Sequence, residues 1–140
     1  MRAADGLRAC IVLQPGLPVG QAANVAACIA AGLAHAAEGL AGQPLRDADG
    51  RESLSSAALP IAVLGADETG LAALWRRAGE SPSAGRCVLF PRYAQTMHEV
   101  QGYWAAHADA RHGEQPLLGL GFAGPQAWVR RLTGALPLLK

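Results

Sequence analysis

Three residue types that can share acid–base or nucleophilic chemistry lie together in "TMHE", residues 96–99. A histidine such as His98 titrates near neutral pH and can serve as a general base, and Glu99 can orient or protonate a reacting group. Thr96 can donate a hydrogen bond or act as a weak nucleophile. These three residues are therefore the catalytic candidates, should the protein be an enzyme.

The same stretch has an interpretation without catalysis. Thr-x-x-Glu is the pattern of a capping box, in which Thr96 caps a helix and Glu99 bonds back to the backbone N–H of the cap. The box explains both of those side chains and leaves His98 as an ordinary exposed histidine. The sequence keeps the two interpretations open.

A second polar group lies on "LPVGQAANVAACIAAGLAHAAEGLAG", residues 17–42, which predicts an alanine-rich helix. A sector of about 60° on this helix holds its polar residues, namely Gln21, Asn24, Cys28 and His35. Apolar residues such as Val25 lie on one side of this stripe, and a row of alanines that includes Ala23 and Ala27 lies on the other. We expect both sides to be buried, so that the stripe either lines a cleft or is simply the solvent side of the helix.

Gln21 and Asn24 are one turn apart at the start of this helix, where free backbone N–H groups and the helix dipole favour an acceptor or an anion. Their amides add donors and acceptors without charge, and no lysine or arginine is close in the sequence. We therefore expect Gln21 and Asn24 to bind a neutral or singly anionic small molecule. His35 lies about 20 Å away along the helix and cannot join this site.

Three other patterns are weak signals. Residues 119–124 satisfy G-x-G-x-x-G between a strand and a helix, but too little chain follows to supply the acidic ribose ligand of a dinucleotide site. "DADG" at 47–50 resembles the start of an EF-hand loop without its remaining ligands, and a hairpin turn explains it. His107 and His112 lack the i, i+4 spacing of a zinc pair, which favours solvated histidines. The sequence thus indicates no cofactor and no metal.

Composition predicts a single globular domain over residues 1–140. Hydrophobic residues make up 51% of the chain and charged residues 16%, and a chain of this length can bury about two thirds of its unfolded surface. A net charge of +1 argues against nucleic acid as a partner. Cys10, Cys28 and Cys87 are odd in number and lie in apolar segments, which is typical of small buried residues in a reducing compartment.

The sequence also argues against export and membrane insertion. The first ten residues lack the apolar core of a signal peptide, and the most apolar run, residues 22–34, is too short for a bilayer span. We therefore expect a cytoplasmic protein with no membrane partner.

The periodicity of the chain alternates strands and helices. Four apolar runs predict buried strands at residues 8–14, 60–66, 86–92 and 116–122. Helical spacing follows each of them, with Asp67 as the N-cap of the second helix and a continuous third helix over residues 93–108. Asp49-Gly50 predicts a type I′ turn in a surface hairpin over residues 44–54. Strands separated by helices indicate the α/β class, with mostly parallel neighbours.

In this order of elements the chain resembles a known family. It is similar to DUF2000, a bacterial family of unknown function, in the segments "GLPVGQAANVAACIAAGLAH", "PIAVLGA", "FPRYAQTMHE" and "LLGLGFAGPQAWVRRLTGALPLL". The known structures of that family are similar to type II peptidyl-tRNA hydrolases. The resemblance covers nearly the whole chain and implies a mixed four-stranded sheet flanked by helices, with a small hairpin insertion. It also allows for a homodimer.

The resemblance places the two polar groups together. In the hydrolase fold the start of the first helix and the segment after the third strand lie at the same end of the sheet. The resemblance therefore implies that Gln21 and Asn24 face the residues of "TMHE" across one small polar cleft.

The chain departs from the hydrolases at the residues that handle RNA. The hydrolases place lysines where their first helix begins, whereas this chain has "VGQAANV", with Gln21, Ala22 and Ala23. Their later loop supplies an aspartate and threonines, and this chain keeps Thr96 without the aspartate. An enzyme acting on tRNA without those cations would lose phosphate binding and charge stabilisation together.

Two functions follow from these residues. The first is a non-catalytic or weakly catalytic domain that presents an uncharged polar cleft to a small ligand or a partner. The second is a small hydrolase or transferase, related to type II peptidyl-tRNA hydrolases, that uses His98 and Thr96. We favour the binding domain, and the sequence leaves catalysis itself open.

We predict that the protein does not hydrolyse peptidyl-tRNA, because "VGQAAN" stands where the hydrolases carry lysine. Incubation with a labelled peptidyl-tRNA measures this directly, with a type II hydrolase as the positive control. Turnover that disappears on Thr96→Ala or His98→Ala substitution would contradict the prediction.

Overall fold

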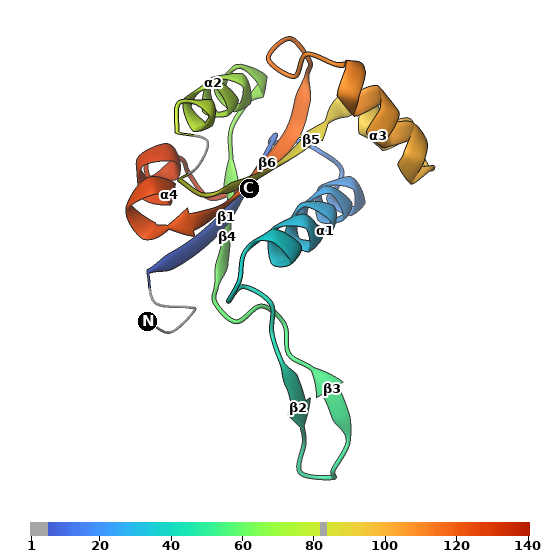
Figure 1. Cartoon of the computed structure of the whole chain (residues 1–140), viewed down its shortest axis with the longest axis vertical. Coiled ribbons are helices and arrows are strands. Elements are labelled where there is room, and N and C mark those ends of the chain that lie inside the picture. The colour runs from blue at the N-terminus through green and yellow to red at the C-terminus, as the bar shows by residue number, and fades with distance from the viewer. Residues whose placement is uncertain (1–5, 82–83) are drawn as a thin grey trace.

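The structure, a computed structural model, describes residues 6–81 and 84–140 and is built on a four-stranded sheet (Figure 1). Its strands lie in the order β4-β1-β6-β5, with the bounds Ile61–Gly65, Leu7–Leu13, Leu117–Pro125 and Arg86–Pro91. β1 runs parallel to β4 and antiparallel to β6, and β6 runs antiparallel to β5. A mixed α/β architecture with a mixed four-stranded sheet is therefore confirmed.

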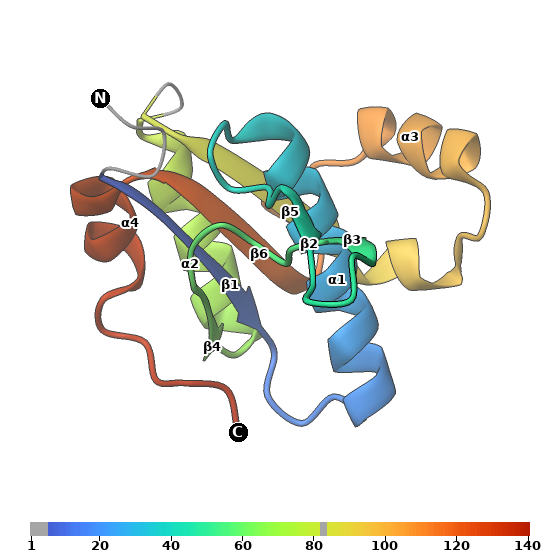
Figure 2. The same ribbon diagram turned by 90° about the horizontal axis from the view of Figure 1, so that it is seen from below.

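The expectation of mostly parallel neighbours is wrong, because the chain between β5 and β6 does not cross the sheet. It forms a 3-10 helix, η1 (Arg92–Thr96), and α3 (Val100–Asp109), which lie beyond the end of β5 and on the outer side of that edge strand (Figure 2). The chain then turns back into β6 beside β5, in the opposite direction. A parallel neighbour requires a crossover over one face of the sheet, as α1 (Val19–Ala36) provides between β1 and β4.

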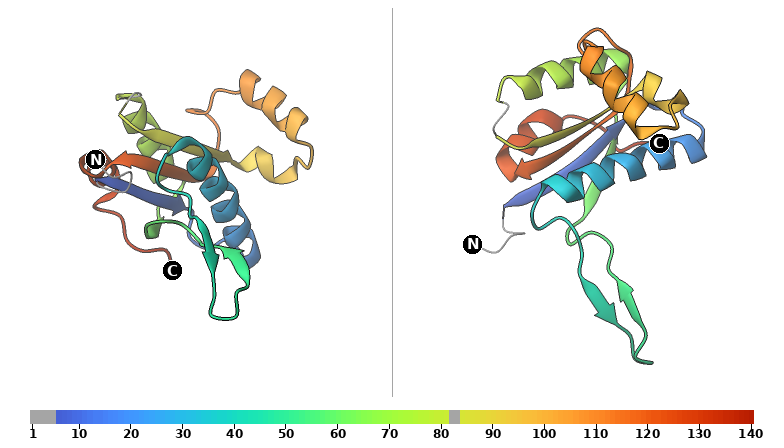
Figure 3. Two further views of the ribbon diagram at one scale, coloured as in Figure 1. Left: turned by 60° about the horizontal axis from the view of Figure 1, so that its bottom comes forward. Right: turned by 45° about the vertical axis from the view of Figure 1, so that its right-hand side comes forward.

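Helices cover both faces of the sheet (Figures 1 and 3). α1 packs on one face, where Val25, Ile29 and Leu33 are buried in one core cluster. The other face is covered by α2 and α4, with the bounds Glu68–Gly79 and Gln126–Thr133. Leu71 of α2 and Trp128 of α4 belong to the second core cluster. The sheet is therefore the middle layer of three.

α1 approaches the sheet closely because β6 carries glycines beneath it. A Cβ on Gly121 would overlap the side chain of Ile29, and a Cβ on Gly119 would lie 3.0 Å from Ile29 Cδ1. Gly32 of α1 lies over β5, where a Cβ would come 3.0 Å from Val88 Cγ2. The first glycines of the G-x-G-x-x-G pattern thus allow a helix to pack, and this explains them without a dinucleotide.

Most of the alanine row on the far side of α1 is not buried, contrary to expectation. Ala23 and Ala27 are exposed, and Ala30 and Ala34 are half-buried. Ala37, just after the C-terminal end of the helix, is buried as expected. A row of alanines can pack closely against a neighbouring element, and it can equally well face solvent. The sequence pattern alone therefore did not show whether this side of the helix is buried or exposed. By length and composition alone the helix is apolar enough to cross a membrane, with a mean hydropathy of 1.3 over 18 residues.

The surface hairpin is confirmed, but its turn differs from the predicted type. Its strands are β2 and β3, Pro44–Arg46 and Glu52–Leu54, and it projects away from the sheet (Figure 3). Type I′ needs positive φ at both central residues, and of the turn residues Gly50 alone has it, at 80°. The Asp47 side chain instead accepts hydrogen bonds from the backbone N–H groups of Asp49 and Arg51, each at 2.9 Å.

One predicted helix start is confirmed and one predicted helix is broken. Asp67 caps α2, since its Oδ1 accepts a hydrogen bond from the Gly70 N–H at 2.8 Å. The continuous third helix is wrong, because extended backbone separates η1 from α3, with ψ of 110° at Met97 and 122° at Glu99. α3 has no buried residue among those described, so core packing does not hold it in line with η1.

Gly121→Ala and Ala27→Leu form a matched test of how α1 packs. The added Cβ at Gly121 overlaps Ile29, and overpacking of this kind costs about 1–3 kcal/mol of unfolding free energy. Ala27→Leu adds a larger group to an exposed side and should change that free energy by less than about 0.5 kcal/mol. Urea unfolding measures both variants. Equal losses would contradict the exposed position of Ala27.

Candidate functional site

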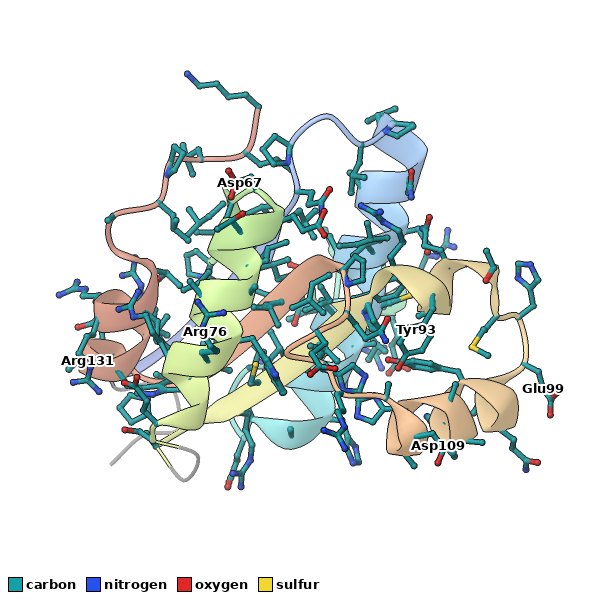
Figure 4. The ribbon with its side chains drawn as sticks, turned by 90° about the horizontal axis from the view of Figure 1, so that it is seen from above. Asp67, Arg76, Tyr93, Glu99, Asp109 and Arg131 are labelled. Atoms are coloured by element: carbon teal, nitrogen blue, oxygen red, sulfur yellow. The ribbon has the colours of Figure 1, made fainter. Side chains whose placement is uncertain are left out.

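A cavity of about 500 Å³ lies between α1, β5, η1 and α3. Figure 4 shows this region, with η1 and α3 to the right of α1. The lining residues are Asn24, Cys28, Val88, Leu89, Phe90, Ala94, Gln95, Met97, His98, Val100, Tyr103 and Trp104. The cavity therefore joins the first helix to the segment after β5, where the family resemblance implies a cleft.

Each wall of the cavity follows from local structure. α1 presents Asn24 and Cys28 because both lie on its polar stripe, one turn apart, away from the side that packs on the sheet. β5 supplies Val88 and Phe90, which lie on the face that α1 covers. The extended backbone at residues 97–99 carries the chain away from the sheet, so the first half of α3 forms the opposite wall.

The structure brings part of the predicted polar cleft together. Asn24 and His98 line the same cavity. Gln21 is not among the lining residues, but its Nε2 donates a hydrogen bond to Oε1 of Gln95, which does line the cavity. One residue of the predicted ligand pair thus faces the cavity, and the other orients a neighbouring amide.

Thr96 and Glu99 do not form the capping box and do not line the cavity. Thr96 Oγ1 donates a hydrogen bond to the Tyr93 carbonyl at 3.1 Å, at the end of η1. Glu99 is itself the N-cap of α3 and makes no side-chain capping bond, and Figure 4 shows it pointing to solvent. The capping-box interpretation is wrong because α3 begins at Val100. A helix capped by Thr96 would have to begin directly after that residue.

Apart from His98, the polar side chains of the lining belong to residue types that do not form ion pairs. Asn24 and Gln95 contribute amides, Tyr103 a phenol and Cys28 a thiol. The lining contains no lysine, arginine, aspartate or glutamate. Such groups can orient a ligand by hydrogen bonds, but they do not provide a counter-ion.

The rim on the α3 side carries exposed apolar side chains. Met97 is 37% exposed, Val100 55% and Trp104 65%. Their helical spacing is typical of a buried face, yet here no part of the core covers them. Large apolar groups that gather at the mouth of a cavity are typical of a binding surface.

Aromatic rings hold α3 to the rest of the protein. Tyr93 Oη lies 2.8 Å from Nε2 of His112, and the ring centroids of His112 and His107 are 4.2 Å apart. Tyr103 meets His107 edge-on at 6.1 Å, and Trp75 meets His112 edge-on at 6.5 Å. The expectation that the two histidines lie on separate faces of a helix is wrong, because α3 ends before His112 and the following loop brings that ring against His107. His107 is exposed as expected, whereas His112 is half-buried.

Burial shifts the titration of this ring cluster. It lowers the pKa of His112, and repulsion from the neighbouring His107 adds to the effect. Burial also raises the pKa of Tyr93 and that of Tyr103, the latter with a contribution from Tyr93 and Cys28. At neutral pH the two phenols are therefore protonated hydrogen-bond donors, and His112 is held toward its neutral form.

The three cysteines differ in their surroundings. Cys10 is buried, and burial raises its pKa, while burial raises the pKa of the half-buried Cys87 to about 12. Cys28 is exposed, contrary to the prediction, because the stripe that carries it faces the cavity. Within the described parts of the chain, no group of three or more His, Cys, Asp or Glu side chains is arranged to hold a metal ion.

A second cavity of about 490 Å³ lies beside the C-terminal residues 137–140. The acidic residue in its lining, Asp67, already caps α2. Apart from Lys140, the other lining residues are apolar residues and glycine. This cavity therefore lacks the set of polar side chains found between α1 and α3.

Sequence reasoning missed Gln95, Tyr103 and Trp104. The sequence held a signal for the last two, which are adjacent aromatic residues and therefore place their rings on two sides of a helix. A helix that buries one face needs large rings on that face only, so the second ring indicates another contact. Gln95 carried no such signal, since its contact with Gln21 joins residues far apart in the chain.

We predict that the free energy of unfolding falls as the pH is lowered below about 6.5, the ordinary pKa of histidine. Because the pKa of His112 is lowered in the folded protein, its contribution is complete above that ordinary value and is lost as the pH falls through the folded pKa. The titratable groups that face it are His107 and Tyr93. Urea unfolding at about pH 7.5 and 5 should show a smaller loss in His112→Gln than in the parent. An equal loss would contradict this role of His112.

Comparison with known proteins places the chain in a family. No curated protein matches it. A solved structure of a protein of unknown function from Agrobacterium tumefaciens has the same fold, with a TM-score of 0.87 at 18% identity over 96% of this chain and 98% of that chain. The family model described as protein of unknown function, DUF2000, matches residues 7–140. The chain therefore belongs to the DUF2000 family, the family that its sequence resembles.

Proposed function

We propose that the protein is a non-catalytic or weakly catalytic binding domain, and that the cavity between α1 and α3 receives an uncharged apolar or aromatic group of the ligand. The lining is the observation that carries this proposal, because it combines carbon surface and amides with no carboxylate or cation. A polyphosphate would find no counter-ion there. A volume of about 500 Å³ lies in the range of small-ligand sites.

The polar groups orient the ligand, and the apolar surface supplies most of the affinity. Tyr103 and Trp104 offer ring faces on which a planar group can stack. Asn24 and Gln95 provide both donors and acceptors, and the hydrogen bond from Gln21 restricts the orientation of the Gln95 amide. This division of roles is typical of sites that bind neutral molecules.

A small hydrolase or transferase, related in fold to the type II peptidyl-tRNA hydrolases, is the second candidate. The order of strands and helices favours it, as does the position of His98 at the cavity, where a general base could reach a ligand. Against it, the Thr96 hydroxyl donates its hydrogen to the Tyr93 carbonyl, and Glu99 points away (Figure 4). The binding domain is the better supported of the two.

The proposal also includes a single domain in the cytoplasm, with neither a membrane nor a nucleic acid as partner. The net charge of +1 supports the absence of a nucleic-acid partner. The packing of Val25, Ile29 and Leu33 of α1 against the sheet supports the absence of a membrane. A homodimer is compatible with the exposed alanine side of α1, and light scattering measures it directly.

Two substitutions on α1 test the cavity. Cys28→Phe fills it from the α1 wall, whereas Ala31→Phe adds the same ring to an exposed position of the same helix outside the lining. The probes are neutral aromatic amides and indole, screened by thermal shift. A probe at about 100 times its Kd should raise the melting temperature of the parent by several degrees.

The expected result is that Cys28→Phe weakens the binding of that probe about tenfold or more, a loss of about 1.4 kcal/mol, and that Ala31→Phe changes it less than about twofold. The proposal is wrong if no probe shifts the parent, or if Cys28→Phe binds as tightly as Ala31→Phe.

A further inference from the structure

The two edges of the sheet differ in whether the chain covers them. At the β4 edge, the C-terminal segment pairs with the strand: the Gly65 N–H donates to the Pro137 carbonyl at 2.9 Å, and the Leu139 N–H donates to the Val63 carbonyl at 3.0 Å. At the other edge, β5 pairs with β6 on one side, and no strand of the described residues lies on its other side. β5 is therefore an open edge.

The register shows which backbone groups of β5 face outward. The Gln14 N–H donates to the Leu118 carbonyl and the Gln126 N–H donates to the Gly6 carbonyl, so the even-numbered residues of β6 bond toward β1. The odd-numbered residues 119, 121 and 123 then bond toward β5, where the register pairs them with residues 90, 88 and 86.

The alternation leaves the N–H and C=O groups of Cys87 and Leu89 on the outer side of β5. No backbone partner within the described residues accepts or donates to them. Pro91 follows at the next outward position and has no N–H, so the open stretch is limited to these two residues. Four backbone groups on this side of β5 are thus without a backbone partner among the described residues.

The open edge borders the cavity between α1 and α3. Residues 88–90 of β5 line that cavity, and Val88 and Phe90 lie on the face that α1 covers. On a neighbouring strand, a residue placed opposite Val88 turns its side chain to the same face. Its side chain would therefore enter the cavity while its neighbours bond to Cys87 and Leu89.

We propose that the open edge of β5 binds an extended peptide of a partner protein as an added antiparallel strand, with one apolar or aromatic side chain in the cavity. This inference rests on the proposed function and names the ligand class of the same site. Backbone hydrogen bonds supply affinity and the cavity selects the side chain, which is the general mode of strand addition. Arg86 is exposed at the start of β5, so an acidic residue at the C-terminal end of the peptide complements it.

A narrow peptide fits this edge better than a second copy of the chain. η1 and α3 continue from β5 and stand on the outer side of the edge (Figures 2 and 4). The cavity lining places residues of α3 across from residues 88–90. A second sheet pairing through its own β5 would have to bring its remaining strands and helices past α3, whereas a single extended segment needs only the space beside the strand.

The probe is the capped peptide acetyl-Val-Thr-Phe-Thr-Val-Glu-amide, whose phenylalanine lies opposite Val88 and whose threonines lie opposite Leu89 and Cys87. The control peptide carries N-methyl groups on the two threonine amides, which removes the donors and keeps every side chain. We expect the control to bind the unaltered protein at least about tenfold more weakly.

Amide hydrogen exchange locates the contact. In the free protein the Cys87 and Leu89 amides should exchange fast and the Val88 amide slowly, because Val88 bonds to β6. The peptide should slow Cys87 and Leu89 to near the rate of Val88. Cys87→Pro removes one outward N–H and should bind about tenfold more weakly than Cys87→Ala, which loses the same thiol and keeps that N–H.

Three outcomes would overturn the proposal. The N-methylated peptide binds as tightly as its parent, or the peptide leaves the Cys87 and Leu89 amides unprotected, or both amides become protected at high protein concentration without peptide, which would show a second copy on the edge. In each case the proposed function still stands if a neutral probe binds the parent protein and binds Cys28→Phe more weakly. If no neutral probe binds the parent protein either, both proposals are rejected.

Discussion

The contact between α1 and the glycines of β6 is the interaction on which the rest of the structure depends. Because Gly119 and Gly121 have no side chains, Ile29 rests on the strand itself and α1 lies over the centre of the sheet. This placement leaves Asn24 and Cys28 beside β5, where they form one wall of the cavity. Any shift of the helix away from β6 would move that wall.

The opposite wall is attached in a different way. None of the described residues of α3 is buried, and the helix is held by rings around His112 and by the bond from Tyr93 to that imidazole. A segment with few buried apolar contacts opens at a lower free-energy cost than a core helix. The cavity therefore combines a rigid wall on α1 with a wall that can adapt to what it binds.

The two edges of the sheet also differ, since one is covered by the chain and the other is not. The C-terminal segment covers β4, while β5 is open beside the cavity. Long open edges favour aggregation, and natural proteins shorten them with proline and charge. Pro91 and Arg86 restrict the open stretch of β5 in this way, which favours one short partner segment over unlimited pairing.

The sequence by itself determined the strands, the hairpin, the Asp67 cap and the stripe that carries Asn24, because each depends on residues a few positions apart. Only the tertiary structure decided that Ala27 is exposed, that β6 returns antiparallel and that His112 stacks on His107. These features depend on which segments far apart in the chain meet and which do not. Local periodicity carries no information about such contacts, since a helical repeat is the same whether its apolar face meets a core, a cavity or solvent.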